Sequence, residues 1–356
     1  MKVGIITQPL GINIGGILQN WALQKTVANM GHNPVTLNFY RPYKVSLKEV
    51  LRVWGRNVRT LLRRLYGRYD RFMTTSDGFP MAANIDFINN EIAVTERCTA
   101  YSPLDGAGAY IVGSDQVWRP RYNIGTLEDS FLRFIGDSQC VRIAYAASFG
   151  TETWELDGSQ TAKCKKLLKR FDAVSVREKS GAVLCRTHLD RDAAVVLDPT
   201  LLLRADDYRR LYSHMPASMP RHTASYFLDI NTTKYKAAVK AARILGAIDI
   251  DLHPRRTHVA EWLSAMASAE VVITDSFHGT VFAIIFHRKF AVLSNHRRGN
   301  SRLHSLLSQL GLENHLIANE SHIDRLVALE PDWHDVECRL DGLRSISLQF
   351  LNDALK

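Results

Sequence analysis

Closely paired cysteines and long apolar runs are both missing from this chain of 356 residues. The five cysteines are widely scattered and form no Cys-x-x-Cys pair, which excludes the common structural zinc motifs and favours a reducing cytosol. The longest apolar run, residues 281–286, ends at three basic residues and is far shorter than the ~20 residues of a membrane-spanning helix. The opening stretch MKVGIITQPL lacks a basic leader and a cleavage site, so we expect a first strand instead of a signal peptide. We therefore expect a cytoplasmic protein that needs no metal ion.

Acidic side chains are also absent, locally, from residues 276–312. The two loops of this region carry a dense set of basic and imidazole side chains: His278, His287, Arg288, Lys289, His296, Arg297, Arg298, Arg302 and His304. Such a region favours an anionic ligand. It argues against the usual nucleotide-sugar pocket, in which a carboxylate in this region commonly holds two ribose hydroxyls.

The net charge of +9 is concentrated in residues 41–71, which contain ten basic residues but only Glu49 and Asp70 as acidic ones. Apolar residues recur there at spacings of three and four: Leu47, Leu51, Trp54, Val58, Leu61 and Leu65. This pattern predicts a basic amphipathic helix over residues 47–71. Three interpretations remain open: a surface helix whose apolar stripe packs on its own domain, a helix that binds an anionic membrane surface, and a nucleic-acid contact. No nucleic-acid-binding motif accompanies the charge, so we expect no nucleic acid as a partner.

Short apolar runs rich in β-branched residues alternate with helical patterns along the whole chain, which is typical of an α/β fold with parallel sheets. Six predicted strands precede residue 200, namely residues 2–7, 33–40, 109–114, 142–148, 172–177 and 193–198. Four more follow at residues 225–230, 247–252, 270–275 and 290–294. We expect two Rossmann-like domains, residues 1–200 and 201–356, with a cleft between them. The last helix, around residues 339–354, is expected to pack back across both domains.

Ligands of open parallel sheets collect beyond the carboxyl ends of the strands, so polar residues just after strands are candidates for a site. After the first strand come Asn13, Gly15 and Gly16, where exposed helix amides can bind an anion, although a simple tight turn fits equally. After the strand at 109–114, Ser114 or Asp115 is expected to cap a helix, and Asp115 is alternatively a base that faces the cleft.

Arg177 follows the strand at residues 172–177, where its guanidinium can grip a phosphate or carboxylate through two parallel hydrogen bonds. The alternative is an ordinary surface ion pair with Glu178. The fourth strand end carries Ser276, His278, Gly279 and Thr280, and we expect His278 in the turn between strand and helix. An imidazole titrates near neutrality, so a histidine in a cationic cleft is a candidate for proton transfer.

Seven stretches of the chain, in this order, resemble the polysaccharide pyruvyl transferase family: NIGGILQNWALQ, IVGSDQVW, IAYAASFG, AVSVREKSG, VVLDPTLLL, TDSFHGTVFAIIF and SRLHSLLSQLGL. The resemblance covers the chain from the first strand to about residue 312. It implies a GT-B-like fold and transfer of a pyruvyl group from phosphoenolpyruvate to two sugar hydroxyls, which gives a cyclic ketal. The implied acceptor is a cell-surface glycan or its lipid-linked precursor, with the acceptor on the N-terminal domain and the donor on the C-terminal domain.

The resemblance also implies roles for individual residues. The family's functional arginine falls on Arg177 and its histidine on His278. Where better-studied members have Arg-Leu-His-Gly, this chain has Ser276-Phe277-His278-Gly279, so we expect Arg298 or Arg302 to supply the missing charge. Asp115 is the candidate partner base. Two other functions remain open: a glycosyltransferase that uses a nucleotide sugar, and a non-catalytic relative in a glycan assembly complex.

Overall fold

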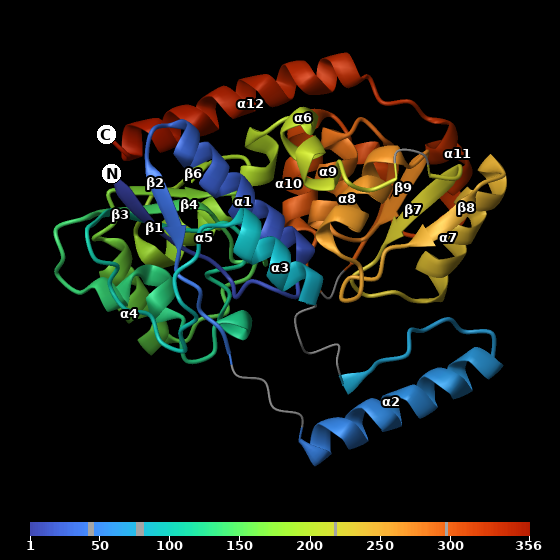
Figure 1. Cartoon of the computed structure of the whole chain (residues 1–356), viewed down its shortest axis with the longest axis horizontal. Helices are drawn as coiled ribbons and strands as arrows, with labels where there is room; N and C mark the ends of the chain where they lie inside the picture. Colours follow the sequence, from blue (N-terminus) through green and yellow to red (C-terminus); the bar gives the residue numbers. More distant parts are fainter. Residues whose placement is uncertain (42–45, 76–81, 217–218, 296–297) are drawn as a thin grey trace.

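Two parallel sheets form the framework of the protein (Figure 1). The computed structural model describes residues 1–41, 46–75, 82–216, 219–295 and 298–356. The first sheet has the order β2-β1-β3-β4-β5-β6, with strands β1 (Lys2–Ile6), β2 (Asn33–Thr36), β3 (Ala107–Val112), β4 (Val141–Ala147), β5 (Ala173–Val176) and β6 (Ala194–Val195). The second has the order β11-β10-β9-β7-β8, with strands β7 (His222–Tyr226), β8 (Ile248–Asp251), β9 (Val271–Thr274), β10 (Lys289–Leu293) and β11 (Leu316–Ile317). The predicted two-domain α/β fold is confirmed.

Helices form the crossover connections between the parallel strands and cover most of both sheets. The longer ones are α1 (Ile14–Asn29), α3 (Ala82–Glu91), α4 (Gly158–Leu168), α5 (Lys179–Leu189), α7 (Thr232–Leu245), α8 (Val259–Ser268), α9 (Phe277–Ile285) and α10 (Ser301–Leu310). The shorter α6 (Ala205–Arg209) and α11 (Ile323–Ala328) complete the set around the sheets. Central strands such as β9 are buried along their whole length, because helices cover both faces of a parallel sheet. For this reason the strands appear in the sequence as continuous apolar runs.

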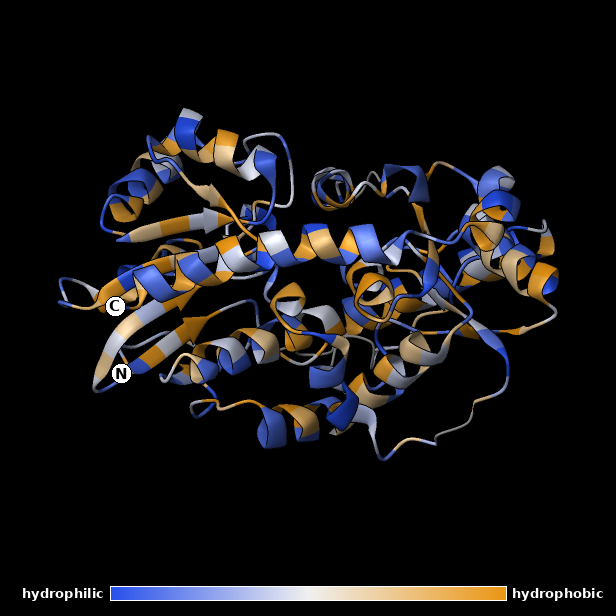
Figure 2. Ribbon diagram, turned by 90° about the horizontal axis from the view of Figure 1, so that it is seen from above, coloured by the Kyte–Doolittle hydropathy of each residue, from blue (hydrophilic) through white to orange (hydrophobic). Residues whose placement is uncertain are grey.

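The last helix, α12 (Trp333–Ala354), begins in the C-terminal region and lies against the N-terminal sheet (Figure 1). The Leu197 amide donates a hydrogen bond to Ser347 Oγ, and Arg344 Nε donates one to the Leu201 carbonyl. In Figure 2 its residues alternate between polar and apolar, as expected of a helix with one face on the core and the other in water. Through these two hydrogen bonds α12 is attached to the segment that joins the two sheets.

Helix α2 (Leu47–Leu65) differs from the prediction in length and in packing. It ends at Leu65, and residues 66–75 run back beside it. Its apolar row is exposed instead of packed on its own domain, so the first of the three interpretations of this helix is wrong. In the part of the chain that the structure describes, no helix is both long enough and apolar enough to cross a membrane.

Candidate active site

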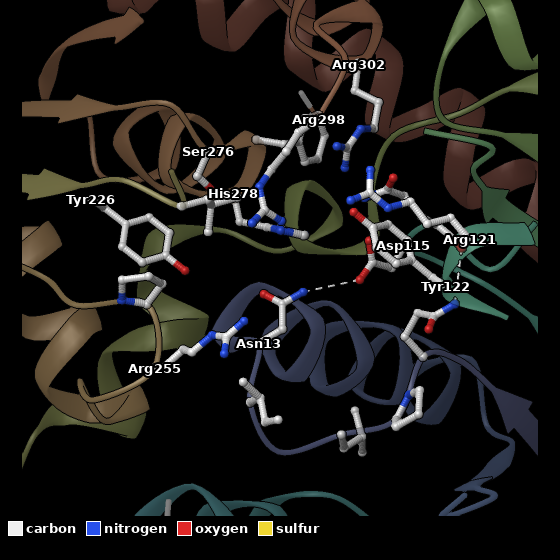
Figure 3. A pocket seen from close by; sticks show the side chains of 18 of the residues that line it. Asn13, Asp115, Arg121, Tyr122, Tyr226, Arg255, Ser276, His278, Arg298 and Arg302 are labelled. Atoms are coloured by element: carbon white, nitrogen blue, oxygen red, sulfur yellow. Dashed lines mark hydrogen bonds between the residues drawn. The ribbon is translucent and has the colours of Figure 1, made fainter. Parts of the chain in front are cut away.

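A cavity of about 930 Å³ lies where the two domains face each other, at the carboxyl ends of strands from both sheets (Figure 3). Its wall is rich in cationic, aromatic and amide side chains. The N-terminal domain contributes Gln8, Asn13, Tyr40, Arg41, Arg97, Asp115, Arg121 and Tyr122, and the C-terminal domain contributes Tyr226, Arg255, Asp275, Ser276, Phe277, His278, Arg298 and Arg302. The position agrees with the rule that ligands of parallel sheets bind beyond the carboxyl ends of the strands.

His278 lies in the first turn of α9, one residue after the helix begins, instead of in the preceding turn. Ser276 is the N-cap, and its Oγ accepts a hydrogen bond from the Gly279 amide. The imidazole is almost completely buried, with Nε2 3.7 Å from Oδ2 of Asp198. This separation is too long for a hydrogen bond but gives an attractive ion pair whenever the ring is protonated.

Helix α1 fixes the other side of the imidazole. A Cβ built on Gly15 would lie 2.1 Å from His278 Nδ1, so only glycine allows the two helices to approach this closely. The α1 N-cap, Asn13, does not cap the helix with its side chain. Its Nδ2 instead donates to Oδ2 of Asp115 at 3.3 Å, as the dashed line in Figure 3 shows. The first amides of α1 and of α9 therefore lie close together at the cavity.

Arg177 is fully buried behind the cavity in a cluster of carboxylates. Its Nη1 donates to Oδ2 of Asp198 at 2.7 Å, and its Nη2 donates to Oδ1 of Asp115 at 3.2 Å. Asp198 also accepts hydrogen bonds from Ser114 Oγ, Thr200 Oγ1 and the Thr200 amide. Glu178 lies on the third side, 3.9 Å from Arg177 Nε. The alternative of a surface ion pair with Glu178 is therefore wrong.

The charges of this cluster keep both aspartates ionised. Burial by itself would raise the pKa of Asp115, but Arg177, His278 and Arg302 outweigh it and lower the pKa below its ordinary value. Burial would likewise raise the pKa of Asp198, but His278, Arg177 and Thr200 hold it well below the usual range. Two ionised carboxylates, Asp115 and Asp198, therefore lie near His278.

Arg302 is a buried cation on the cavity wall, and in the described ranges it has no hydrogen-bond or ion-pair partner. Burial and the charge of Arg177 lower the pKa of Arg302 to about 10. The two guanidiniums share one aromatic ring, because Arg177 Cζ lies 4.8 Å and Arg302 Cζ 5.7 Å from the centroid of Phe277. A buried cation without a partner is energetically costly, and an anion bound in the cavity would offset that cost.

Arg298, in contrast, is neutralised within the protein. Its Nε donates to Oδ2 of Asp229 at 2.6 Å. Asn295 Nδ2 donates hydrogen bonds to the carboxylates of Asp229 and Asp275. Lys234 forms a close ion pair with Asp275. Asp229 and Asp275 are therefore engaged with groups of the protein, whereas Arg302 has no such partner among the described residues.

The structure brings part of the predicted set to the cavity surface and places the rest directly behind it. Lining the cavity are Asn13, Asp115, Ser276, His278, Arg298 and Arg302. Behind this wall lie Gly15, Gly16, Ser114, Arg177, Gly279 and Thr280. Gly279 packs so closely that an added Cβ would lie 2.3 Å from Thr274 Oγ1, and Thr280 Oγ1 donates back to the Ser276 carbonyl. Gly16 similarly faces the Asn13 side chain, with 3.2 Å between an added Cβ and Nδ2.

The prediction that Ser114 or Asp115 caps a helix is wrong. Residues 113–140 contain only turns and 3₁₀ helices, namely η2 (Pro120–Tyr122), η3 (Glu128–Phe131) and η4 (Arg133–Ile135). Asp115 has a φ of 69°, in the left-handed region, which no helix start adopts. Its carboxylate and the Ser114 hydroxyl are used instead to hold Arg177, Asn13 and Asp198. His296 and Arg297, which the sequence placed among the basic residues of this region, lie outside the described residues.

Several residues of the site were not singled out from the sequence. Asp198 follows β6, so the rule about strand ends applies to it as well, although the sequence predicted it only as the last residue of the strand at 193–198. Phe277 and Glu178 carried no signal, since apolar and acidic residues are common next to helix starts. Arg121 and Tyr122 lie in the short 3₁₀ helix η2, where no periodicity in the sequence marks them.

Comparison with known proteins gives a family and a fold. The family model described as polysaccharide pyruvyl transferase matches residues 13–297, most of the chain. Among solved structures, UGT89C1 of Arabidopsis thaliana complexed with UDP-L-rhamnose is 10% identical, with a TM-score of 0.52 over 100% of this chain and 99% of that chain. UDP-GlcNAc 2-epimerase from Methanocaldococcus jannaschii is 11% identical, with a TM-score of 0.49 over 93% of each chain. At such identity the similarity to UGT89C1 shows the GT-B-like fold alone. No curated protein sequence matches the chain.

Proposed function

Because the chain belongs to the polysaccharide pyruvyl transferase family, we propose that it moves a pyruvyl group from phosphoenolpyruvate to two hydroxyls of one sugar. The sugar is part of a cell-surface polysaccharide or of its lipid-linked precursor. The observation that supports this donor most directly is Arg302, a buried cation on the cavity wall without a partner among the described residues. It lies in the same cavity as His278, beside two helix N-termini.

Phosphoenolpyruvate carries a phosphate and a carboxylate, and this part of the cavity has the groups that bind them. The Arg302 guanidinium presents paired N–H donors suited to either anion. The uncapped amides of α1 and the first amides of α9 add the positive ends of two helix dipoles. Arg298, the other arginine predicted to supply charge here, is paired with Asp229 and adds little to the positive field. We therefore assign the donor to the C-terminal domain, residues 201–356.

The proposed reaction is an addition followed by a substitution. One sugar hydroxyl loses its proton and forms a bond to C2 of phosphoenolpyruvate, while C3 gains a proton and becomes a methyl group. The second hydroxyl then bonds to C2 as the bond from C2 to the phosphate oxygen breaks, and its proton leaves with the products. The result is a cyclic ketal and inorganic phosphate. We propose that this chemistry requires acid–base groups and a cationic cradle, without a metal or an organic cofactor.

His278 is the proposed proton-transfer residue, since it lines the cavity and an imidazole exchanges protons near neutral pH. Asp198 is a positioning residue that stabilises the imidazolium from 3.7 Å. Asp115, with its lowered pKa, is a weak proton acceptor, so we assign it a different role from the partner base predicted from sequence. Its negative charge stabilises the cations around it, and its carboxylate holds Asn13 in place.

The acceptor is assigned to the N-terminal domain, residues 1–200. Its wall of the cavity carries the aromatic rings of Tyr40 and Tyr122 and the amides of Gln8 and Asn13. Aromatic faces and amides are suited to the apolar faces and hydroxyls of a sugar. We propose a cytoplasmic location at the inner face of the membrane, where a lipid-linked acceptor is anchored, and the five unpaired cysteines support a reducing compartment.

Mass spectrometry of a candidate lipid-linked oligosaccharide incubated with the protein and phosphoenolpyruvate tests the proposal. A pyruvyl ketal should form, and inorganic phosphate should be released in equal amount. A parallel incubation with UDP-sugars in place of phosphoenolpyruvate serves as the comparison. Glycosyl transfer in that second reaction, with no ketal in the first, would replace the proposal by a nucleotide-sugar transferase. Absence of both reactions across an acceptor panel, in a folded protein that binds neither donor, would favour a non-catalytic scaffold.

A further inference from the structure

Helix α2 presents an apolar face that nothing in the described chain covers. Its exposed apolar residues recur every three or four positions, so they share one face of the helix. Leu47 is 75% exposed, Trp54 67% and Leu65 74%. The others on this face that remain exposed are Val50, Leu51, Val58, Leu61 and Leu62. A contiguous apolar surface of this kind marks a binding site in a folded protein.

A second face of α2 is basic and solvated. Lys48, Arg52, Arg56, Arg59 and Arg63 follow one another at the same helical spacing along the flank of the apolar stripe, and all are exposed. The nearby acidic residues are few and already paired, Glu49 with Arg52 and Asp70 with Arg63. The flank therefore carries a strong excess of positive charge.

The third face of α2 is the one that packs on protein. Val53 and Thr60 are buried, and the Asn57 side-chain amide and the Met73 backbone exchange two hydrogen bonds of 2.8 Å. Arg64 donates to the Asp70 carbonyl and lies over the rings of Tyr69 and Phe72. The returning segment, residues 66–75, thus covers this third face and leaves the apolar stripe free.

The returning segment also fastens the unit to the C-terminal domain. Tyr69 stacks on Tyr235 with 3.9 Å between ring centroids, and its amide donates to Thr232 Oγ1. Arg71 donates to the Phe227 carbonyl and pairs with Asp251. Figure 1 shows α2 standing apart from the two sheets on one side of the molecule, held by this segment. The helix is therefore anchored at its base, with its apolar face outward.

We propose that α2 binds the surface of an anionic lipid bilayer, with the apolar stripe in the interfacial region and the basic flank on the headgroups. The positive charge of α2 favours an anionic bilayer over a second copy of the chain, because two copies would bring identical rows of positive charge together. Trp54 and the arginines combine an apolar body with a polar end, which suits the boundary between headgroups and acyl chains. The cavity-lining residues Tyr40 and Arg41 precede the helix and Ile85 follows it, so bilayer binding brings the cavity close to the lipid.

The benefit to catalysis rests on the proposed function, since only a lipid-linked acceptor gains from this placement, but lipid binding itself is measured without any reaction. The experiment is co-sedimentation of the full chain with vesicles of phosphatidylcholine alone or with about one third phosphatidylglycerol, at low and high salt. We expect binding only to the anionic vesicles and release by salt, because salt screens the surface field over about 10 Å at 0.1 M.

Two variants separate the contributions of charge and of apolar contact. Replacing the four arginines 52, 56, 59 and 63 by Gln should weaken partition into anionic vesicles by about tenfold or more, as should the triple variant Leu51→Ser, Trp54→Ser, Leu61→Ser. All these side chains are exposed, so the fold should be unaffected. Matched controls carry the same changes elsewhere on the exposed surface: Lys169, Arg186, Arg209 and Lys236 to Gln, and Ile124, Val183 and Ile346 to Ser.

Three outcomes would overturn the proposal. One is a native protein that stays in the supernatant with anionic vesicles at low salt. The second is an equal loss of binding in the α2 variants and their matched controls, which would assign the effect to overall charge. The third is a dimer in sedimentation velocity without lipid that Trp54→Ser abolishes, which would assign the apolar face to a second copy. Ketal formation on a water-soluble acceptor should be unchanged in all α2 variants, so failure of this proposal and failure of the proposed reaction are distinguishable.

Discussion

Gly15 in the first turn of α1 and His278 in the first turn of α9 are in direct contact across the two domains. A Cβ added to Gly15 would lie 2.1 Å from Nδ1 and 2.4 Å from Cγ of the imidazole. The contact explains why a helix of the N-terminal domain can hold a residue of the C-terminal domain in a defined orientation. It also joins the N-termini of two helices where the proposed donor binds.

Gly15→Ala should impair turnover in a protein that still folds. The backbone angle of Gly15 is one that alanine adopts freely, so the effect comes only from the collision with His278. We expect kcat/KM to fall on the order of 10²-fold, the usual result of misplacing a reacting group by about 1 Å. The free energy of unfolding should fall by about 1–3 kcal/mol, the usual cost of an added methyl group in a tightly packed interior, so the variant should stay folded. Steady-state kinetics and urea denaturation measure the two quantities.

The matched control for this prediction is Gly342→Ala, which adds a methyl group within α12 where no atom lies within 4 Å. It should leave kcat/KM unchanged. An unchanged rate in Gly15→Ala itself would show that the contact with His278 has no functional role.

Replacing His278 tests the proposed proton transfer. His278→Gln should lower kcat by about 10²-fold or more while the protein stays folded, since a positioned acid or base contributes on this scale. The pH dependence of kcat/KM gives the sharper readout, because a limb of the profile that arises from the imidazole should disappear in the variant. If the variant keeps both the rate and this limb of the pH profile, another group carries out the proton transfer.

Arg302→Met should stabilise the ligand-free protein and abolish donor binding. Burial lowers the pKa of Arg302 to about 10, so its charged form at neutral pH costs stability in the native state. Removing the charge should raise stability by about 1–3 kcal/mol. Thermal unfolding with and without phosphoenolpyruvate should then show a higher midpoint that the donor no longer raises.

Arg298→Met is the contrasting variant. Its guanidinium is paired with Asp229, so the substitution leaves a half-buried carboxylate without its partner and should lower stability. If Arg302→Met instead lowered stability and kept the donor-induced shift, the assignment of Arg302 to the donor would fail.

The sequence was sufficient to predict the strands for a physical reason. Strands such as β9 and β10 are buried on both faces, so each appears as an uninterrupted apolar run. The two-residue strand β11 is too short to leave such a pattern. The length of α2 was overestimated because basic residues continue past Leu65, whereas the chain turns back at Gly67, which has a φ of 70°.

The sequence predicted the location of the site better than it predicted the contacts among the residues of the site. The rule about strand ends led to Asn13, Asp115 and His278, all of which line one cavity. It also led to Arg177, but the carboxylates that surround Arg177 follow two other strands, β3 and β6, and only the sheet order brings them together. These tertiary contacts decide which arginine has no partner among the described residues. The sequence alone therefore does not distinguish Arg302 from Arg298.

Arg177 was predicted from sequence to hold the donor, with a loss of donor affinity on the order of 1.5–3 kcal/mol in Arg177→Ala from lost charge-assisted hydrogen bonds. Its position behind the cavity leads us to expect a larger effect on stability. Arg177→Met leaves Asp115 and Asp198 buried without their main counter-ion, which should cost about 3–5 kcal/mol. Chemical denaturation at neutral pH measures this loss, and isothermal titration with phosphoenolpyruvate measures the affinity.

The pH dependence of stability on the acid side should be weaker in Arg177→Met than in the native protein. In the native protein the pKa values of Asp115 and Asp198 are lowered, so their contribution is present above about pH 4 and is lost as the pH falls further. In the variant Arg177 no longer opposes burial, so both pKa values should be less depressed, although His278 still lowers them. A smaller part of the stability should then be lost as the pH falls below about 4. Denaturation series at several pH values check this, with Arg186→Met on the exposed surface as the control. Parallel pH profiles for Arg177→Met and the native protein would show that the two aspartates are neutralised by other groups.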